Sequence, residues 1–267
     1  MKFLKVGAVV FGALIITTLG ISAADTFSGN SGSLLGQLSG TQEGACPAGM
    51  TEVVVGKTFS CVDTYEVSAA ETCPNTSPKT IQDTQFNIND LACITESKAD
   101  GKPWTYVSRS QAQALCARSG KRLPSSDEWY TFSVGTLDGN KQCNTDSSGA
   151  AASGAYGICV SAAGVYDAVG NVWEWTTDDV FDGTYNNRPL PQEGYVTQVD
   201  AAGVATLTSS SPSQEFEKDY LWQNPEGIYG VLRGGFFGSG EDAGVYAVHA
   251  RTAPTAATIA IGFRCVL

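Results

Sequence analysis

The chain has 267 residues, and its 27 Asp and Glu residues outnumber its 16 Lys and Arg residues, for a formal net charge of −11. An acidic surface repels phosphate backbones, so the composition argues against nucleic acid as a partner. The length suffices for one domain with a substantial hydrophobic core, and nothing in the sequence marks a second boundary inside that domain.

Residues 1–24 are typical of a secretory signal peptide. Lys2 and Lys5 precede an uncharged stretch of apolar and small residues, residues 6–24, which ends in an A-x-A-like cleavage region. This stretch is also long enough to span a bilayer, so an N-terminal anchor that stays uncleaved is the alternative. Both alternatives predict an exported protein that is secreted or displayed at the cell surface, with a membrane contact only through the anchor.

The composition then changes twice along the chain. Residues 25–44 consist mostly of Gly, Ser, Thr, Leu and Gln without periodicity, which predicts a flexible linker. Residues 45–267 are predicted to form the single folded domain. The domain begins with two β-rich runs, residues 51–55 and 58–67, and the Gly-Lys pair between them predicts a hairpin.

The cysteines indicate a disulfide framework. There are eight of them, an even number, and an exported chain meets an oxidising compartment in which disulfides persist. Metal binding by thiolates is the alternative, but the chain has no C-x-x-C pair and a single histidine, which disfavours a zinc site. Proximity in sequence predicts three pairs and leaves two cysteines for the fourth: Cys46–Cys61, Cys73–Cys93, Cys143–Cys159 and Cys116–Cys265.

Two capping boxes predict two short helices. Ser108 with Gln111 opens a helix that Gly120 ends, and Ser125 with Glu128 opens a second helix shortly afterwards. In each box a hydroxyl and a Glu or Gln side chain satisfy backbone N–H groups of the first helical turn.

The remaining segments are rich in turns and short strands. Residues 71–100 and 143–159 are dominated by small and polar residues and are predicted to be loops. Residues 195–199 and 204–207 are predicted to form a hairpin before a strand at residues 229–232. The whole predicts an α+β domain with short strands, two short helices and many loops.

Seven motifs follow one another along the chain: residues 61–68, the helix at 108–120, RLPSSDEW at 122–129, residues 164–167, GNVWEW at 170–175, RGG at 233–235 and GFRC at 262–265. Their joint occurrence in this order resembles the formylglycine-generating enzyme family, also called the sulfatase-modifying-factor domain. The resemblance extends from about Cys46 to Leu267, and it implies a variant of the C-type lectin fold.

The resemblance also implies that this chain is not an enzyme. Enzymes of that family use two cysteines in the segment after RGG to bind copper and activate oxygen. At the matching positions this chain has Ser239 and Gly244, and neither residue provides a thiolate. All eight cysteines lie outside residues 233–264. An enzyme of the same fold with altered chemistry is the alternative.

The C-terminal segment contains a narrower set of motifs: Arg233-Gly234-Gly235, Phe237, Ala243-Gly244, Ala253-Pro254 and Ile261-Gly262-Phe263-Arg264. This set resembles the variable proteins of diversity-generating retroelements. Those proteins end with RGG, an aromatic residue, an Ala-Gly step, an Ala-Pro step and I-G-F-R, with substitutable sites between these elements.

The resemblance further implies which residues vary. In those systems adenines of asparagine codons are mutated, which yields neither Lys, Gln, Glu, Met nor Trp. The segment of residues 236–260 lacks Asn, Lys, Gln, Met and Trp, with Glu241 as its one departure. The implied ligand-binding positions all hold permitted residues: Phe236, Gly238, Ser239, Asp242, His249, Arg251, Thr252, Ala256, Thr258 and Ala260.

These resemblances predict a ligand-binding display protein. Its variable segment, residues 236–260, would recognise a protein or glycan on another cell or particle, while glycines, buried aromatic residues and a disulfide hold the backbone. His249 is expected to be a contact residue and not a general base, since no motif supplies a nucleophile. A structural protein of the cell surface whose loops bind no ligand is the further alternative.

The GNVWEW motif carries two interpretations. Trp173 and Trp175 are expected in the core. In the enzyme family calcium is held around this motif, which implies Asn171 and Glu174 as oxygen ligands of a structural calcium ion. Internal hydrogen bonding by these two side chains is the alternative, and no other cofactor is expected.

Overall fold

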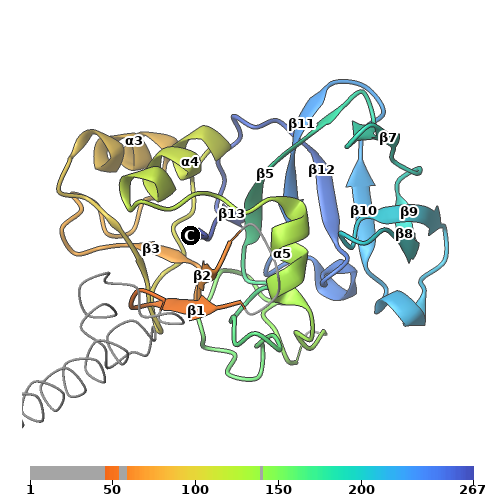
Figure 1. The fold of residues 1–267 in the computed structure, drawn as a ribbon, viewed down its shortest axis with the longest axis horizontal. Coiled ribbons are helices and arrows are strands. Elements are labelled where there is room, and N and C mark those ends of the chain that lie inside the picture. Colours follow the sequence, from red (N-terminus) through yellow and green to blue (C-terminus); the bar gives the residue numbers. More distant parts are fainter. Residues whose placement is uncertain (1–45, 54–58, 139–140) are drawn as a thin grey trace, which may run out of the picture. The chain divides into compact units, whose positions relative to one another are not determined.

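The structure is a computed structural model that describes residues 46–53, 59–138 and 141–267. The residues from Cys46 to Leu267 form one compact unit (Figure 1). The predicted signal peptide and linker, residues 1–24 and 25–44, lie outside the described residues. Among the helices that the structure describes, none combines the length and the apolar character needed to cross a membrane.

A nine-stranded mixed sheet forms the larger part of the unit. Its longest strand, β5, pairs antiparallel with β11, and β13 runs parallel to the start of β5. The strands in spatial order are β7 (Arg188–Pro189), β6 (Thr184–Tyr185), β5 (Trp173–Phe181), β11 (Ile228–Arg233), β12 (Val248–Thr252), β10 (Tyr220–Gln223), β8 (Gly194–Val199) and β9 (Ala205–Ser209), with β13 (Ile261–Gly262) off this path.

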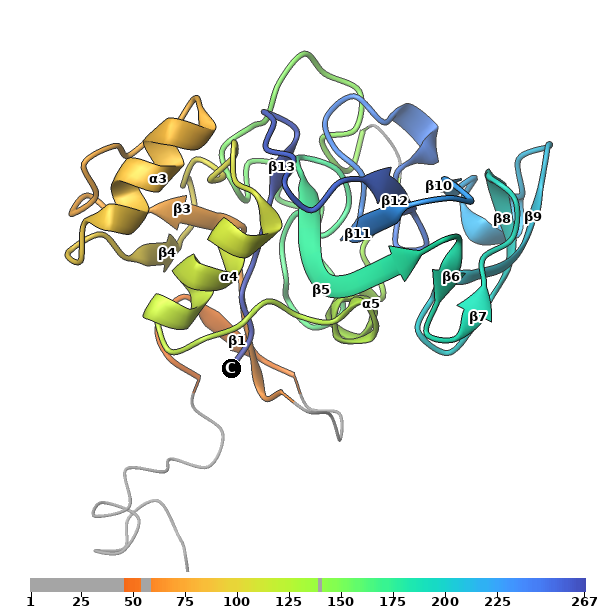
Figure 2. The same cartoon turned by 90° about the horizontal axis from the view of Figure 1, so that it is seen from above.

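Two small sheets and three helices complete the α+β fold in the part of the chain that the structure describes. Strand β1 (Met50–Glu52) pairs with β2 (Cys61–Asp63), and β3 (Val67–Ala69) pairs with β4 (Thr95–Ser97). Figure 2 shows β3 and β4 on one side of β5, and β10, β8 and β9 on the other. The helices are α3 (Ile81–Asn89), α4 (Arg109–Arg118) and α5 (Ser126–Ser133), and two 3-10 turns are η1 (Gln214–Phe216) and η2 (Gly240–Asp242).

Both capping-box predictions are confirmed. In α4 the Ser108 hydroxyl accepts a hydrogen bond from the Gln111 backbone N–H, and the Gln111 side chain accepts one from the Ser108 N–H. Ser125 and Glu128 form the same reciprocal pair at the start of α5. The sequence signal works here because both hydrogen bonds are local and need no tertiary partner.

The prediction of a loop at residues 71–100 is wrong, because this stretch contains α3 and β4. The Thr80 hydroxyl accepts a hydrogen bond from the Asp83 N–H, and the Asp83 carboxylate accepts one from the Lys79 N–H. A Thr-x-x-Asp cap was therefore present in the sequence, and the polar composition of the stretch concealed it. The described residues of the domain thus contain three short helices and not the predicted two.

Paired antiparallel strands are present at both predicted hairpins, with bounds that differ from the predicted ones. Thr51 lies opposite Val62 in β1 and β2, while the predicted turn at Gly56 and Lys57 lies outside the described residues. Strands β8 and β9 pair antiparallel, as expected for the hairpin at residues 195–207. The loop predicted at residues 143–159 has no helix or strand in its described part.

All four predicted disulfides are present: Cys46–Cys61, Cys73–Cys93, Cys116–Cys265 and Cys143–Cys159. Three of them close loops of 15 to 20 residues, and the fourth spans 149 residues to join α4 to the C-terminal segment. That segment also pairs with the rest of the fold through Val266, which bridges to Val62 and to Arg122.

Removing the long-range disulfide should cost more stability than removing a short-range one. In the chain-entropy model, the Cys116→Ser/Cys265→Ser variant loses about 5 kcal/mol of unfolding free energy, and the Cys143→Ser/Cys159→Ser control loses about 3 kcal/mol. Urea unfolding of both variants measures the difference. Equal losses would show that the long closure contributes nothing extra.

Candidate ligand-binding face

The two arginines that bracket the variable segment are buried structural residues. The Arg233 side chain is fully buried, lies over the Trp129 ring at 4.9 Å, and donates to Ser126 Oγ at 3.0 Å and to the Val245 carbonyl at 2.8 Å. These contacts tie the start of the segment to α5 and to the segment's own middle. Buried charges of this kind persist only where hydrogen bonds satisfy them.

Arg264 closes the other end of the segment. Its guanidinium is fully buried and donates to both carboxylate oxygens of Glu174 in β5, through Nε at 2.9 and 2.8 Å and through Nη2 at 2.5 Å. It also donates to the carbonyls of Asp63 and Tyr166 at 3.0 and 2.8 Å. The end of the variable segment is thereby held to three separate parts of the chain.

The two glycines of RGG occupy positions that other residues cannot take. Gly234 has φ +89° and Gly235 has φ +93°, which are left-handed conformations that L side chains avoid. A Cβ at Gly234 would also overlap the carbonyl oxygen of Ala168, and a Cβ at Gly235 would overlap the Ala243 side chain. These two positions therefore require glycine, and they fix the backbone conformation at the start of the variable segment.

The implied calcium ligands are engaged in internal hydrogen bonds. Besides Arg264, the Glu174 carboxylate accepts from Trp129 Nε1 at 2.8 Å. Asn171 Oδ1 accepts from Asn144 Nδ2 at 2.9 Å and from the Ala151 N–H at 2.8 Å.

These partners do not fit a calcium site, because a guanidinium occupies the face of Glu174 that a cation would need. Within the part of the chain that the structure describes, no group of three or more His, Cys, Asp and Glu side chains is arranged to hold a metal ion. The contacts agree with the alternative of internal hydrogen bonding, and calcium binding stays an untested prediction.

The position matched to the second catalytic cysteine has no room for a side chain. A Cβ at Gly244 would overlap the carboxylate of Asp219, which is fully buried against it. At the other matched position, Ser239 Oγ accepts a hydrogen bond from the Phe236 N–H at 3.1 Å and thereby stabilises the local turn. All cysteines of the described residues are in disulfides. Neither position offers a metal-binding thiolate.

None of the ten predicted ligand-binding residues is buried. They lie in three stretches: the turn around η2, strand β12, and the loop before β13. Three of them are exposed, Gly238, Arg251 and Thr258, and the others are partly exposed: Phe236, Ser239, Asp242, His249, Thr252, Ala256 and Ala260.

The residues of β12 lie on an outward face of the main sheet. His249 and Arg251 alternate along the strand with the buried residues Val248 and Ala250, which pack into the core behind the sheet. Arg251 donates to both carboxylate oxygens of Glu193 at 3.1 and 2.9 Å. Glu241 of the η2 turn pairs with Lys218 at 2.8 Å, two residues before β10, which places this turn near the same part of the sheet.

A row of aromatic rings continues this face beyond the variable segment. Neighbouring ring centroids are 5.0 Å apart from Tyr195 to Tyr220, 4.9 Å from Tyr220 to Trp222, and 6.0 Å from Trp222 to His249. Trp173 closes the row, with its centroid 5.4 Å from both Trp222 and His249.

Tyr195, Tyr220 and Trp222 were not predicted from the sequence to belong to this face. Tyr220 and Trp222 flank the buried Leu221 in β10, an i, i+2 pattern that indicates one outward face. Strand pairing brings Tyr195 opposite Tyr220 and His249 beside Trp222. No local sequence motif predicts this cross-strand register, because it depends on strands that are distant in sequence.

His249 is a neutral polar member of the row. Burial, and then the charge of Arg251, lowers the pKa of His249 to about 4, so the imidazole is uncharged at neutral pH. Its Nδ1 atom is buried and forms no hydrogen bond within the described residues. The part of His249 that a ligand can meet is therefore a neutral ring that lies between Trp173 and Trp222.

The chain is similar to known proteins. The family model described as "Sulfatase-modifying factor enzyme 1-like domain" matches residues 31–267. Over 137 residues the chain is 31% identical to "Inactive C-alpha-formylglycine-generating enzyme 2" of Bos taurus and 28% identical to the protein of the same name in Mus musculus. The match covers 41% of this chain in both cases, and 46% and 44% of the relatives, so the chain spans less than half of their length.

Solved structures similar to this chain include "Major Tropism Determinant M1 Variant", at TM-score 0.47 and 19% identity over 84% of this chain and 53% of that one. Another is "Treponema denticola variable protein 1", at TM-score 0.40 and 14% identity over 83% of this chain and 92% of that one.

Filling the space at Gly244 should destabilise the protein. Because a new methyl group would overlap the buried Asp219 carboxylate, Gly244→Ala should lower the unfolding free energy by about 3 kcal/mol or more. Gly157→Ala is the control, since a Cβ there meets nothing within 4 Å. Chemical denaturation of both variants gives the comparison, and a Gly244→Ala protein as stable as the control would contradict the steric argument.

Asp167 should make stability fall as pH rises. Burial raises the pKa of Asp167 to about 6 from an ordinary value of 3.8, so the folded state holds this proton more tightly than the unfolded state. The resulting stabilisation is present below about pH 4 and is lost as pH rises through about 6. Asn can keep the hydrogen bond that Asp167 accepts from the Gly154 N–H and suits the left-handed φ of +55°.

We therefore expect Asp167→Asn to raise the unfolding free energy at pH 7 by about 1 to 3 kcal/mol and to flatten its dependence on pH between about 4 and 6. Urea unfolding across this pH range measures both effects. The matched control is Asp182→Asn, an exposed aspartate that also has positive φ and accepts from a glycine N–H. A pH profile unchanged by Asp167→Asn would contradict the assignment.

Proposed function

The chain belongs to the sulfatase-modifying factor enzyme 1-like family, and from this membership we propose that it is a binding protein without catalytic activity. Its curated relatives are named as inactive formylglycine-generating enzymes. In this chain a buried carboxylate fills the space beside Gly244, where the family's second catalytic cysteine is expected. The geometry supports recognition in place of bond chemistry.

The observation that carries the proposal is the outward face around β12. All ten predicted ligand-binding residues keep some exposure there or in the adjoining turns, whereas the arginines that bracket the segment are fully buried. A backbone held from behind lets side chains in front change at little cost to the fold, because surface substitutions usually alter stability by under about 0.5 kcal/mol.

The face divides into a constant part and a variable part. Tyr195, Tyr220 and Trp222 lie outside residues 236–260 and supply rigid aromatic area, which loses little conformational entropy on binding. His249 and Arg251 lie inside the segment and would set which ligand is preferred. Aromatic and Arg side chains carry most of the energy at typical binding surfaces.

We extend the proposal to location and partner. Four disulfides suit an oxidising compartment outside the cytosol, which supports a secreted or cell-surface protein. The ligand would be a protein or glycan on another cell or particle. Sibling copies of the gene whose differences are confined to the ten positions would support diversification, and a template repeat with a reverse transcriptase beside the gene would explain it.

The proposal predicts tolerance at the ten positions. A library randomised at these positions should keep most members folded, with melting temperatures within about 5 °C of the parent. The control library randomises five scaffold positions instead and should be largely unfolded: Gly234, Gly235, Phe237, Ala243 and Ala250. Proteolysis of displayed libraries, read by sequencing, measures both, and similar survival of the two libraries would refute a dedicated display face.

The same library tests binding. Selection of its members against immobilised glycans and against purified bacterial surface proteins should yield specific binders. In such binders Trp222→Ala should weaken affinity at least about tenfold, because it removes constant contact area from the face. If selected affinities are unchanged by Trp222→Ala and by Arg251→Ala alike, the ligand does not contact this face.

A further inference from the structure

The C-terminal end of α3 exposes three large apolar side chains at the edge of the unit opposite β8 and β9 (Figure 2). Phe86 is 67% exposed, Leu91 is 86% exposed and Ile94 is 44% exposed. Two backbone hydrogen bonds draw this stretch into a tight turn, from the Asp90 N–H to the Phe86 carbonyl and from the Cys93 N–H to the Asp90 carbonyl. We call the three residues the α3 patch. Exposed apolar patches mark surfaces that another group covers.

A modification motif lies in the loop before α3. Asn75-Thr76-Ser77 has the form Asn-x-Ser/Thr, in which x is not proline, and the sequence contains this form once. In exported proteins it is the acceptor motif for attachment of a glycan to the asparagine side chain. A motif of this kind gains meaning from its place in the fold, because it must lie at the surface.

Hydrogen bonds and a disulfide hold the motif next to the α3 patch. The Asn75 N–H donates to Asn87 Oδ1 at 2.9 Å, and Asn87 Nδ2 donates to the Asn75 carbonyl at 2.7 Å. Asn87 directly follows Phe86 in α3. The Cys73–Cys93 disulfide also joins the residues just before the motif to the residue just before Ile94. A group attached to Asn75 would therefore start at the border of the patch.

The motif is accessible and has the shape of a surface turn. Thr76 is exposed and Asn75 is partly exposed. The Ser77 N–H donates to Asn75 Oδ1 at 3.0 Å, which bends the motif into an Asx turn. The Asn75 side chain also forms a hydrogen bond with the Asp83 carboxylate. A glycosylated amide nitrogen keeps one N–H, so this contact is compatible with the modification.

Charge favours a glycan over a second copy of the protein as the cover of the patch. The carboxylates of Asp83 and Asp90 lie beside it in sequence, and the chain has a formal net charge of −11. Two copies would bring like charges together at this surface, whereas an uncharged glycan would not. A covalently attached glycan also needs no binding affinity of its own, because its attachment point keeps it beside the patch.

We propose that Asn75 carries an N-linked glycan that covers the α3 patch. The donor is an oligosaccharide attached to a polyprenyl diphosphate. A bond forms between Asn75 Nδ2 and the anomeric carbon of the sugar, while the bond from that carbon to the diphosphate oxygen breaks. Nδ2 loses one proton, and the polyprenyl diphosphate leaves with the electron pair of the broken bond. The inference rests on the proposed export of the chain and is independent of what its variable segment binds.

The test uses the full chain, produced in its own host and recovered separately from the cytosol and from the exported fraction. Mass spectrometry of the intact protein and of the proteolytic peptide that contains Asn75 measures the modification. We expect this peptide from the exported protein to carry an added mass of whole sugar residues. The peptide is read equally well from folded and unfolded protein, so the result does not depend on the stability of a variant.

Two variants and a control assign the attachment residue. Ser77→Ala leaves Asn75 in place but removes the hydroxyl that the motif requires, so the added mass should be lost. Asn75→Gln should have the same effect. Asn89→Gln changes an exposed asparagine of α3 that belongs to no such motif, and this variant should keep the added mass.

Binding of an apolar fluorescent dye tests whether the glycan covers the patch. Ser77→Ala should increase dye fluorescence at least about twofold over the glycosylated parent, because the α3 patch becomes accessible. Adding Phe86→Ser and Leu91→Ser to Ser77→Ala should remove this increase, which assigns it to the patch.

Each result supports or overturns the proposal. An exported protein whose Asn75 peptide has no added mass overturns the glycan and leaves the proposed location and recognition intact. Protein found only in the cytosol overturns both the glycan and the proposed location. Added mass that persists in Ser77→Ala overturns the assignment to Asn75, and dye fluorescence that stays unchanged after loss of the glycan overturns its covering role.

Discussion

The buried pair of Arg264 and Glu174 is the interaction on which the rest of the structure depends. The guanidinium also donates to carbonyls of Asp63 and Tyr166, and the carboxylate accepts from Trp129. One ion pair thus joins the C-terminus, the first hairpin, β5 and α5. Both charges are removed from water, and such a pair is kept only with all of its hydrogen bonds in place, because losing one partner costs about 3 to 5 kcal/mol.

That constraint explains why the C-terminal segment can face solvent. Arg233 and Arg264 hold its two ends from inside, Gly234 and Gly235 direct its backbone, and the Cys116–Cys265 disulfide closes it covalently. Strand β12 then alternates between a buried side that packs into the core and an outward side that does not. Stability and recognition are assigned to opposite sides of the same strand.

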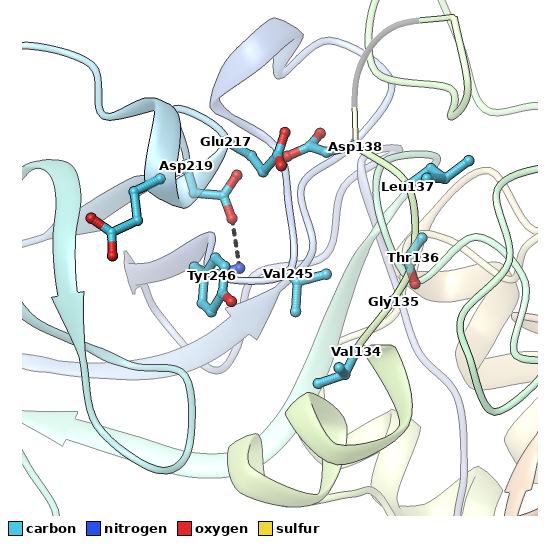
Figure 3. A pocket seen from close by; sticks show the side chains of 10 residues that line it. Val134, Gly135, Thr136, Leu137, Asp138, Glu217, Asp219, Val245 and Tyr246 are labelled. Atoms are coloured by element: carbon cyan, nitrogen blue, oxygen red, sulfur yellow. Dashed lines mark hydrogen bonds between the residues drawn. The ribbon is translucent and has the colours of Figure 1, made fainter.

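Two different surroundings lie next to the C-terminal segment, an aromatic face in front of it and an acidic cavity on its flank. In front, aromatic rings from β8 and β10 extend the face that His249 and Arg251 begin. On its flank, the buried Asp219 side chain fills the space that Gly244 leaves and contributes to the lining of a cavity (Figure 3). Gly244, where the family's enzymes are expected to have a cysteine, is thus a structural requirement of this chain.

Local and covalent features were determined by the sequence alone. We could predict the capping boxes of α4 and α5, all four disulfide pairs and the family motifs. Each of these features depends only on neighbouring residues or on the spacing of cysteines. Helix α3 was not predicted, although its N-cap residue, Thr80, can be recognised in the sequence. Only the tertiary structure decided what pairs across strands or through the core: the aromatic row, Arg264 with Glu174, and Asp219 behind Gly244, because register and burial depend on residues distant in sequence.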